Sequence, residues 1–185
     1  MIPITPSWTL FLDRDGVINH EIKGDYIRNW QQFAFMEKAL DAMKILSSAF
    51  KRIIIVTNQR GVGLNLMTLE DLETIHRNMT HEIEKHGGRI DKIYYCTDHD
   101  RQNSICRKPK PEMAFRAKKD FPEIDLSKSI IVGNSESDME FGRNAGMKTV
   151  FILDKKSPKP CKADLIDCTC ASLFEFATNT IVSLE

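Results

Sequence analysis

The first residues of the chain that could do chemistry are two carboxylates, Asp13 and Asp15, which directly follow the short apolar run 9–12. An isolated pair of this kind has an ordinary explanation, since Asp often bonds backbone N–H groups in turns and helix caps. A buried strand that ends in charge, however, places its carboxylates at the carboxyl edge of a sheet, where open α/β folds bind ligands. We therefore expect an active site at this edge.

Other polar groups follow further apolar runs in the same way. The run Ile53–Val56 ends in Thr57, and Arg107 and Lys108 lie in the loop after a third run. Residues 134–138, which include Asn134 and Asp138, follow the run 130–132. This ordered set is much more specific than any one of its members, because the carboxyl ends of parallel strands meet at one edge.

The elements that must position these groups alternate between strand and helix. Apolar runs predict strands at 9–12, 53–56, 90–96, 130–132 and 149–153, and a short one near Leu165 and Ile166. Helical spacing predicts helices over 36–50, 69–86, 111–120, from after 138 to about 145, and from about 172. Thr68 and Asp71 resemble a capping box at the start of the second of these helices. Residues 17–35 have no sustained period and are interpreted as a flap or short hairpin. The pattern predicts a doubly wound parallel sheet of five to six strands in a single domain, 1–185, without a large cap.

Composition argues against several classes of function. The chain has 185 residues with 26 basic and 26 acidic side chains, so no net charge attracts nucleic acid or an anionic membrane. No apolar segment approaches the roughly 18–20 residues that span a bilayer, and the N-terminus does not resemble a signal peptide. Five cysteines with irregular spacing, and no signal, indicate reduced thiols in the cytoplasm.

The ordered motifs resemble those of the haloacid dehalogenase (HAD) superfamily of phosphohydrolases, over roughly residues 9–153. FLDRDGVIN, TNQRGVG and CRKPKPEM together are similar to the branch that contains heptose-bisphosphate and histidinol-phosphate phosphatases. The resemblance implies a Rossmann-like core and Mg²⁺-dependent hydrolysis of a small sugar phosphate. The implied reaction removes the 7-phosphate of D-glycero-D-manno-heptose 1,7-bisphosphate in ADP- or GDP-heptose synthesis for cell-envelope polysaccharide such as lipopolysaccharide. Histidinol phosphate is the alternative substrate.

The resemblance also implies the catalytic roles. Asp13 would be the nucleophile that forms an aspartyl-phosphate, and Asp15 would protonate the leaving oxygen and later activate water. That second role needs a raised proton affinity at Asp15, and a neighbouring carboxylate acts in that direction. Thr57 would hydrogen-bond the phosphoryl oxygens and Lys108 would neutralise them.

The resemblance also guides the choice of expected binding residues. The expected Mg²⁺ ligands are Asp13, the Asp15 backbone carbonyl, Asn134 and Asp138. Asn134 stands where the family has Asp, which lowers the ligand charge and the expected affinity; a poorly active relative is the alternative. Arg60, Arg107 and Lys110 are candidates for a second phosphate. The full set of expected substrate-binding residues is Asn58, Gln59, Arg60, Arg107 and Lys110.

A zinc loop of the branch is incomplete here. Cys96 and Cys106 remain, but Asp98 stands at a His position and Ser104 at the third ligand position, and His99 is adjacent to the expected place. Two thiolates with Asp98 or His99 are the alternative ligand set for Zn²⁺. Structural zinc sites are almost always complete four-ligand sets, so we expect a loop without structural Zn²⁺. Cys161, Cys168 and Cys170 are expected to be ordinary reduced thiols.

Two rival functions remain open at this point. A non-enzymatic receiver-type domain also combines a doubly wound sheet with an acidic cluster, Thr and Lys, but its accepting Asp follows the third strand, where this chain has Tyr95 and Cys96. A phosphatase acting on nucleic-acid ends is disfavoured by the neutral charge. His76 and His81 are expected on a helix surface or in a groove. We expect a monomer.

Overall fold

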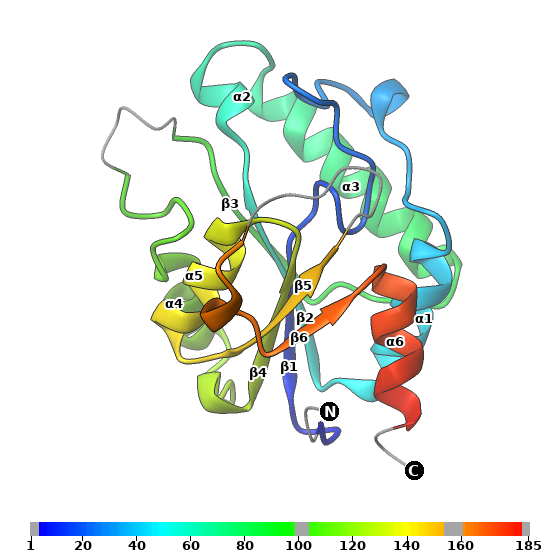
Figure 1. Ribbon diagram of the computed structural model, residues 1–185. Coiled ribbons are helices and arrows are strands. Elements are labelled where there is room, and N and C mark those ends of the chain that lie inside the picture. Colours follow the sequence, from blue (N-terminus) through cyan, green and yellow to red (C-terminus); the bar gives the residue numbers. More distant parts are fainter. Residues whose placement is uncertain (1–3, 99–103, 154–160, 183–185) are drawn as a thin grey trace.

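One central sheet organises the chain (Figure 1). The computed structural model describes residues 4–98, 104–153 and 161–182, and within them the sheet has six parallel strands in the order β3-β2-β1-β4-β5-β6. The predicted doubly wound fold is therefore confirmed. The order changes direction between β1 and β4, which is where such sheets bind ligands. The strands are β1 (Thr9–Leu12), β2 (Arg52–Asn58), β3 (Lys92–Cys96), β4 (Ser129–Gly133), β5 (Lys148–Ile152) and β6 (Cys168–Cys170).

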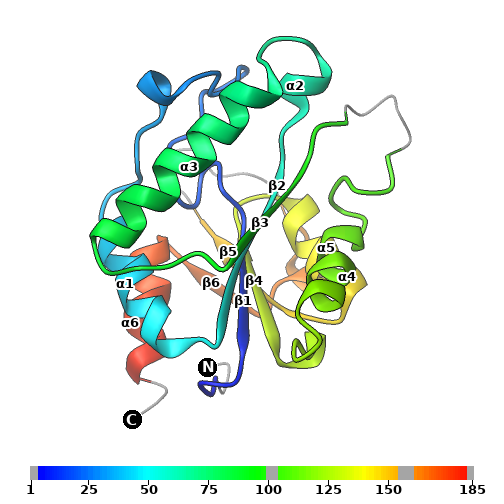
Figure 2. The same ribbon diagram turned by 180° about the vertical axis from the view of Figure 1, so that it is seen from behind.

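Helices cover both faces of the sheet (Figures 1 and 2). On one face lie α1 (Ala39–Ala49), α3 (Leu69–Lys85) and α6 (Leu173–Val182), and on the other lie α4 (Glu112–Asp120) and α5 (Glu136–Ala145). β1 shows why its sequence lacks polar alternation: Leu10 and Leu12 pack into the first layer and Phe11 into the second. No helix in the described ranges is long and apolar enough to cross a bilayer.

Local signals fix the start of two important helices. Thr68 and Asp71 form the predicted capping box at α3, with reciprocal bonds between side chains and backbone N–H groups. Ser135 and Asp138 form a second box at α5, which fixes one candidate site residue. Short elements complete the chain: α2 (Arg60–Gly63) and the 3-10 turns η1 (Trp30–Gln32), η3 (Leu126–Lys128) and η4 (Ala163–Leu165).

The prediction of a short strand near Leu165 and Ile166 is wrong. Leu165 ends η4, and the sixth strand lies two residues beyond Ile166, where Cys168–Cys170 pairs with β5. A three-residue edge strand of Cys-Thr-Cys has no apolar run, so pairing with its neighbour decides its position.

Residues 17–35 form the expected flap beside the sheet edge. A bridge between Asn19 and Phe35 closes its base, and Ile27 packs against Leu72 and Ile75 of α3. The described connections between strands and helices are otherwise short, so no large cap covers the edge.

Candidate active site

The predicted catalytic residues meet in one cavity of about 360 Å³ at the carboxyl ends of β1, β2 and β4. Two expected binding residues, Gln59 and Lys110, are not among its lining residues; Gln59 is buried and Lys110 is exposed. The residues around the cavity are Asp13, Asp15, Glu21, Thr57, Asn58, Arg60, Arg107, Lys108, Asn134, Ser135, Ser137 and Asp138.

Lys108 forms ion pairs with two carboxylates, Asp13 and Asp138, in the lining of this cavity. Its Nζ donates to Asp13 Oδ1 at 2.8 Å, to Asp138 Oδ1 at 2.5 Å and to the Val56 carbonyl at 2.8 Å. All three ammonium hydrogens therefore have acceptors. Burial lowers the pKa of Lys108, but the two carboxylates outweigh this and raise it, so the group stays charged.

Asp13 is held in an unusual electrostatic environment. Burial raises its pKa, Lys108 opposes that change, and the charges of Asp138 and Asp15 add to it, so the pKa is raised to about 6. The carboxyl is thus ionised near neutral pH, as a nucleophile must be. Oδ2 of Asp13 takes no hydrogen bond from the described residues and stays available to a ligand.

Asp15 differs from its expected state. Burial raises its pKa, but the Arg14 charge and hydrogen bonds from Arg14, Asn19 and Gln59 outweigh burial, so the pKa is lowered. The expectation of a raised proton affinity is therefore wrong for this state of the protein. The residue responsible is Arg14, whose Nη2 lies 2.8 Å from both Asp15 oxygens and which sequence reasoning passed over as the middle of D-x-D.

Asp138 stabilises the loop that follows β4. Besides the Lys108 bond, its Oδ2 accepts from the backbone N–H groups of Asn134 and Ser135 at 3.2 and 3.0 Å and from Ser135 Oγ at 2.6 Å. Gly133 makes room for this packing, since a Cβ there would lie 2.3 Å from Asp138 Cβ. Both oxygens of Asp138 are thus already engaged by protein donors.

Asn134 reaches the cavity because Gly16 has no side chain. Gly16 has a φ of +83°, and a Cβ there would lie 1.9 Å from Asn134 Nδ2. The turn after β1 therefore brings the Asn134 amide close to the backbone of the D-x-D-G segment.

Asn58, which ends β2, and Gln59, which follows it, connect neighbouring parts of the site. Gln59 Nε2 donates to both Asp15 Oδ2 and Thr57 Oγ1 at 2.8 Å. Asn58 accepts from the Lys108 backbone N–H at 3.0 Å and donates to the Lys108 carbonyl at 3.2 Å. These contacts connect the end of β2 to the segment of Asp13 and Asp15 and to the loop that carries Lys108.

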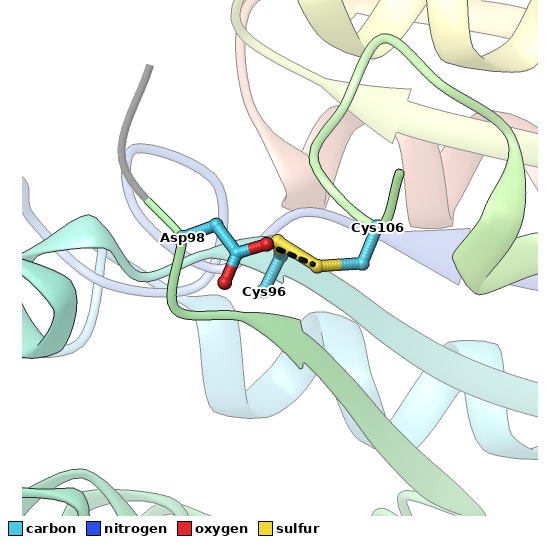
Figure 3. A group of neighbouring side chains, drawn as sticks. All are labelled: Cys96, Asp98 and Cys106. Atoms are coloured by element: carbon cyan, nitrogen blue, oxygen red, sulfur yellow. Dashed lines mark hydrogen bonds between the residues drawn. A yellow bond between two sulfur atoms is a disulfide. The ribbon is translucent and has the colours of Figure 1, made fainter. Parts of the chain in front are cut away.

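The expectation of reduced thiols is wrong for Cys96 and Cys106, which form a disulfide (Figure 3). Their two Cα atoms lie 5.6 Å apart, within the range that a disulfide can bridge, although the cysteines are ten positions apart in sequence. The Asp98 carboxylate points at the bond, 3.7 Å from Cys106 Sγ, and Ser104 Oγ lies 3.2 Å from each sulfur. His99 lies outside the described residues. Cys161, Cys168 and Cys170 are free, as predicted.

Known proteins are similar to this chain in sequence and in fold. A relative from Mycobacterium bovis, a D-glycero-alpha-D-manno-heptose-1,7-bisphosphate 7-phosphatase, is 38% identical over 171 residues, which cover 92% of this chain and 90% of the relative. The chain belongs to the heptose-bisphosphate phosphatase family of HAD-like hydrolases. This phosphatase also matches the HAD-hydrolase-like family model over residues 105–166. Because members of the family are phosphoric monoester hydrolases, the receiver-type alternative is excluded.

Two further comparisons extend this result. A D-glycero-beta-D-manno-heptose-1,7-bisphosphate 7-phosphatase from Helicobacter pylori is 34% identical to this phosphatase. The matched residues cover 84% of this chain and 88% of the relative. The crystal structure of a D,D-heptose 1,7-bisphosphate phosphatase from B. bronchiseptica, complexed with magnesium and phosphate, has a TM-score of 0.83 at 23% identity, covering 95% and 98% of the two chains. That similarity shows a common fold.

Proposed function

We propose that this phosphatase removes the 7-phosphate of D-glycero-D-manno-heptose 1,7-bisphosphate, with Mg²⁺ and a phosphorylated Asp13, in ADP- or GDP-heptose synthesis. The observation that carries the proposal is the ionised, buried Asp13 at the cavity floor, with the Lys108 ammonium on one of its two oxygens. Relatives named for this reaction match nearly the whole chain, which favours this substrate over histidinol phosphate.

The proposed reaction has two displacements. The Asp13 carboxylate attacks phosphorus, the bond from phosphorus to the sugar oxygen breaks, and Asp15 gives its proton to that oxygen. Asp15 then takes a proton from water, whose oxygen attacks phosphorus and releases the Asp13 carboxylate and inorganic phosphate. Thr57 Oγ1 accepts from Gln59, so its own hydrogen can be donated to a phosphoryl oxygen.

Asp15 must carry a proton when the substrate arrives, although its pKa is lowered in this structure. A phosphate group placed beside Asp15 disfavours the charged carboxylate, because like charges raise the pKa of an acid. Binding of the substrate therefore supplies the change that the first step needs.

The donors around Asp13 suit a magnesium ion. Mg²⁺ prefers oxygen ligands, and the three lining residues Asp13, Asp15 and Asn134 can offer a carboxylate oxygen, a backbone carbonyl and an amide oxygen. When bound, the ion supplies positive charge to the phosphoryl oxygens in the transition state. Asp138 was also expected as a ligand; with both oxygens bound by protein donors, we assign it to holding Lys108 and the loop.

The second phosphate of the substrate has a candidate binding region. A neighbouring cavity of about 410 Å³ is lined by residues 21–26 of the flap and shares Glu21 and Arg60 with the catalytic cavity. Arg60 hydrogen-bonds the Tyr26 hydroxyl, which holds its guanidinium at the junction. We propose that Arg60 and Arg107 bind the distal phosphate, with Lys110 at the rim.

The test is a panel of phosphate esters with Mg²⁺ or with a chelator. It compares both anomers of the heptose bisphosphate with histidinol phosphate, and ³¹P NMR identifies the phosphate that leaves. We expect Mg²⁺-dependent release of one phosphate per bisphosphate, leaving the 1-phosphate. A higher kcat/KM for histidinol phosphate, or release that persists in the chelator, would refute the proposal.

Several expectations remain predictions. These are a monomeric state, a cytoplasmic location, the lack of a nucleic-acid partner, and a loop without structural Zn²⁺. Cys96, Asp98 and Cys106 place one ligand atom each within 4.8 Å of the others, but the sulfurs of a disulfide are not thiolates, which zinc requires.

A further inference from the structure

A buried chain of polar side chains leads from the catalytic cavity into the protein. Arg14, between the two aspartates, is 1% exposed, which is rare for an arginine without strong partners. Its Nη2 donates to both Asp15 oxygens at 2.8 Å and its Nε donates to Oδ1 at 3.2 Å. Three hydrogen bonds from one planar group fix the orientation of the Asp15 carboxylate.

His76 of α3 is the next member of this chain. It is 6% exposed, against the expectation of a surface or groove position, and its Nε2 lies 3.3 Å from Arg14 Nη1. The guanidinium has donors only, so the histidine nitrogen must be the acceptor. Burial and the Arg14 charge lower the pKa of His76 to about 3, which keeps the ring neutral and able to accept.

The surroundings of His76 give it little freedom to move. Its ring packs against the ring of Tyr95, with 5.6 Å between the centroids. Tyr95 belongs to β3 and His76 to α3, so two elements of the fold support the acceptor. Without an acceptor here, the Nη1 group of Arg14 would be a buried donor without a partner. That cost would favour other orientations of the guanidinium, in which it no longer holds Asp15.

We propose that His76 is a positioning residue for proton transfer to the leaving group: it accepts from Arg14, which in turn holds the Asp15 carboxylate toward the substrate. This inference rests on the proposed function, in which Asp15 is the acid. Misplacement of a catalytic group by about 1 Å can cost on the order of a hundredfold in rate. Loss of the acceptor should therefore slow only those reactions that need the acid.

Two substrates with different leaving groups distinguish this role from a purely structural one. A sugar phosphate releases a poor alcohol leaving group and needs the proton, whereas p-nitrophenyl phosphate releases a stable phenolate and does not. We expect His76→Leu to lower kcat/KM for the sugar phosphate about 10- to 100-fold, and kcat/KM for p-nitrophenyl phosphate less than about threefold. The parameter kcat/KM is used because it reports the first transfer to Asp13.

His76→Gln is the conservative rescue, because its side-chain oxygen can reach the position of Nε2; His76→Asn is polar but too short. Gln should retain wild-type values with both substrates within about threefold, and Asn should show the selective loss, which keeps the test valid if Leu impairs folding. His81→Leu, at an exposed position of the same helix, is the control. Equal losses on both substrates, or no loss in Leu and Asn, would overturn the inference. An inactive wild type would instead refute the proposed function.

Discussion

Replacing Lys108 by Met should destabilise the protein, because two buried carboxylates in the lining of the cavity lose their shared cation. The substitution keeps most of the side-chain volume but removes the ammonium that lies between Asp13 and Asp138, at 2.8 and 2.5 Å. Both carboxylates stay buried, and breaking a buried ion pair by removing one partner costs about 3–5 kcal/mol. For a chain of this length that corresponds to a fall in Tm of about 6–20 °C.

A surface pair supplies the matched control. Lys92 donates to Asp120 at 2.7 Å, but both side chains are more than a third exposed. Lys92→Met should therefore change the free energy of unfolding by less than about 1 kcal/mol. The distances in the two pairs are alike, so the comparison isolates the effect of burial.

The assay is urea unfolding near neutral pH in a chelator, at low and at high salt. The loss in Lys108→Met should be the same at both salt concentrations, because water and ions do not screen a buried pair. Adding Asp138→Asn to this variant should recover part of the loss by removing one stranded charge. A loss below about 1 kcal/mol, or a loss that high salt removes, would refute the reasoning.

Three further predictions concern the remaining site residues. Asp13→Asn should abolish turnover. It should also abolish the covalent phosphoenzyme that we expect to trap when the wild type reacts with radiolabelled substrate and is quenched with acid. Residual hydrolysis would contradict a nucleophilic Asp13. The folded pKa of His76, about 3, lies below its value of 6.5 in the unfolded chain, so the unfolded state takes up the proton first and stability falls as the pH drops below 6.5. Between neutral pH and about pH 5, this protonation should cost the wild type about 2 kcal/mol in its free energy of unfolding, measured with urea. His76→Gln should lose about 2 kcal/mol less over the same pH range, and an equal loss in both proteins would contradict this. Asn134→Asp adds a carboxylate and should lower the Mg²⁺ concentration for half-maximal activity about tenfold, and an equal or higher requirement would argue against Asn134 as a ligand.

The strands of the sheet were predictable where burial dictates composition. Residues 53–56 are apolar without alternation because helices cover both faces of β2, and the observed strand extends the prediction by only a few residues. The capping box at Thr68 was readable because it is a local interaction. β6 was misplaced because it has no apolar run and is defined by its pairing with β5.

The cavity was predictable for a different reason. In a parallel sheet, residues that end β1, β2 and β4 must lie at one edge, so Asp13, Thr57 and Asn134 meet whatever the details of packing. The link from Arg14 to His76 spans 62 positions and depends on how α3 lies against the D-x-D turn. No spacing rule contains that information, which is why His76 was expected at the surface. The direction of the Asp15 pKa was missed for a nearer reason, because the side chain of the adjacent Arg14 turns back onto the Asp15 carboxylate.

The charges inside the site explain why a divalent cation suits it. Asp13, Asp15 and Asp138 carry three negative charges, and Lys108 and Arg14 balance two of them through short contacts. One negative charge is left among these groups, and a phosphate dianion would have to approach it. A divalent cation beside Asp13 reverses the sign of that sum, so the ion and the substrate each favour binding of the other. Arg14 and Lys108 are far apart in sequence, and the fold brings both cations to this edge, each against its own carboxylate partners.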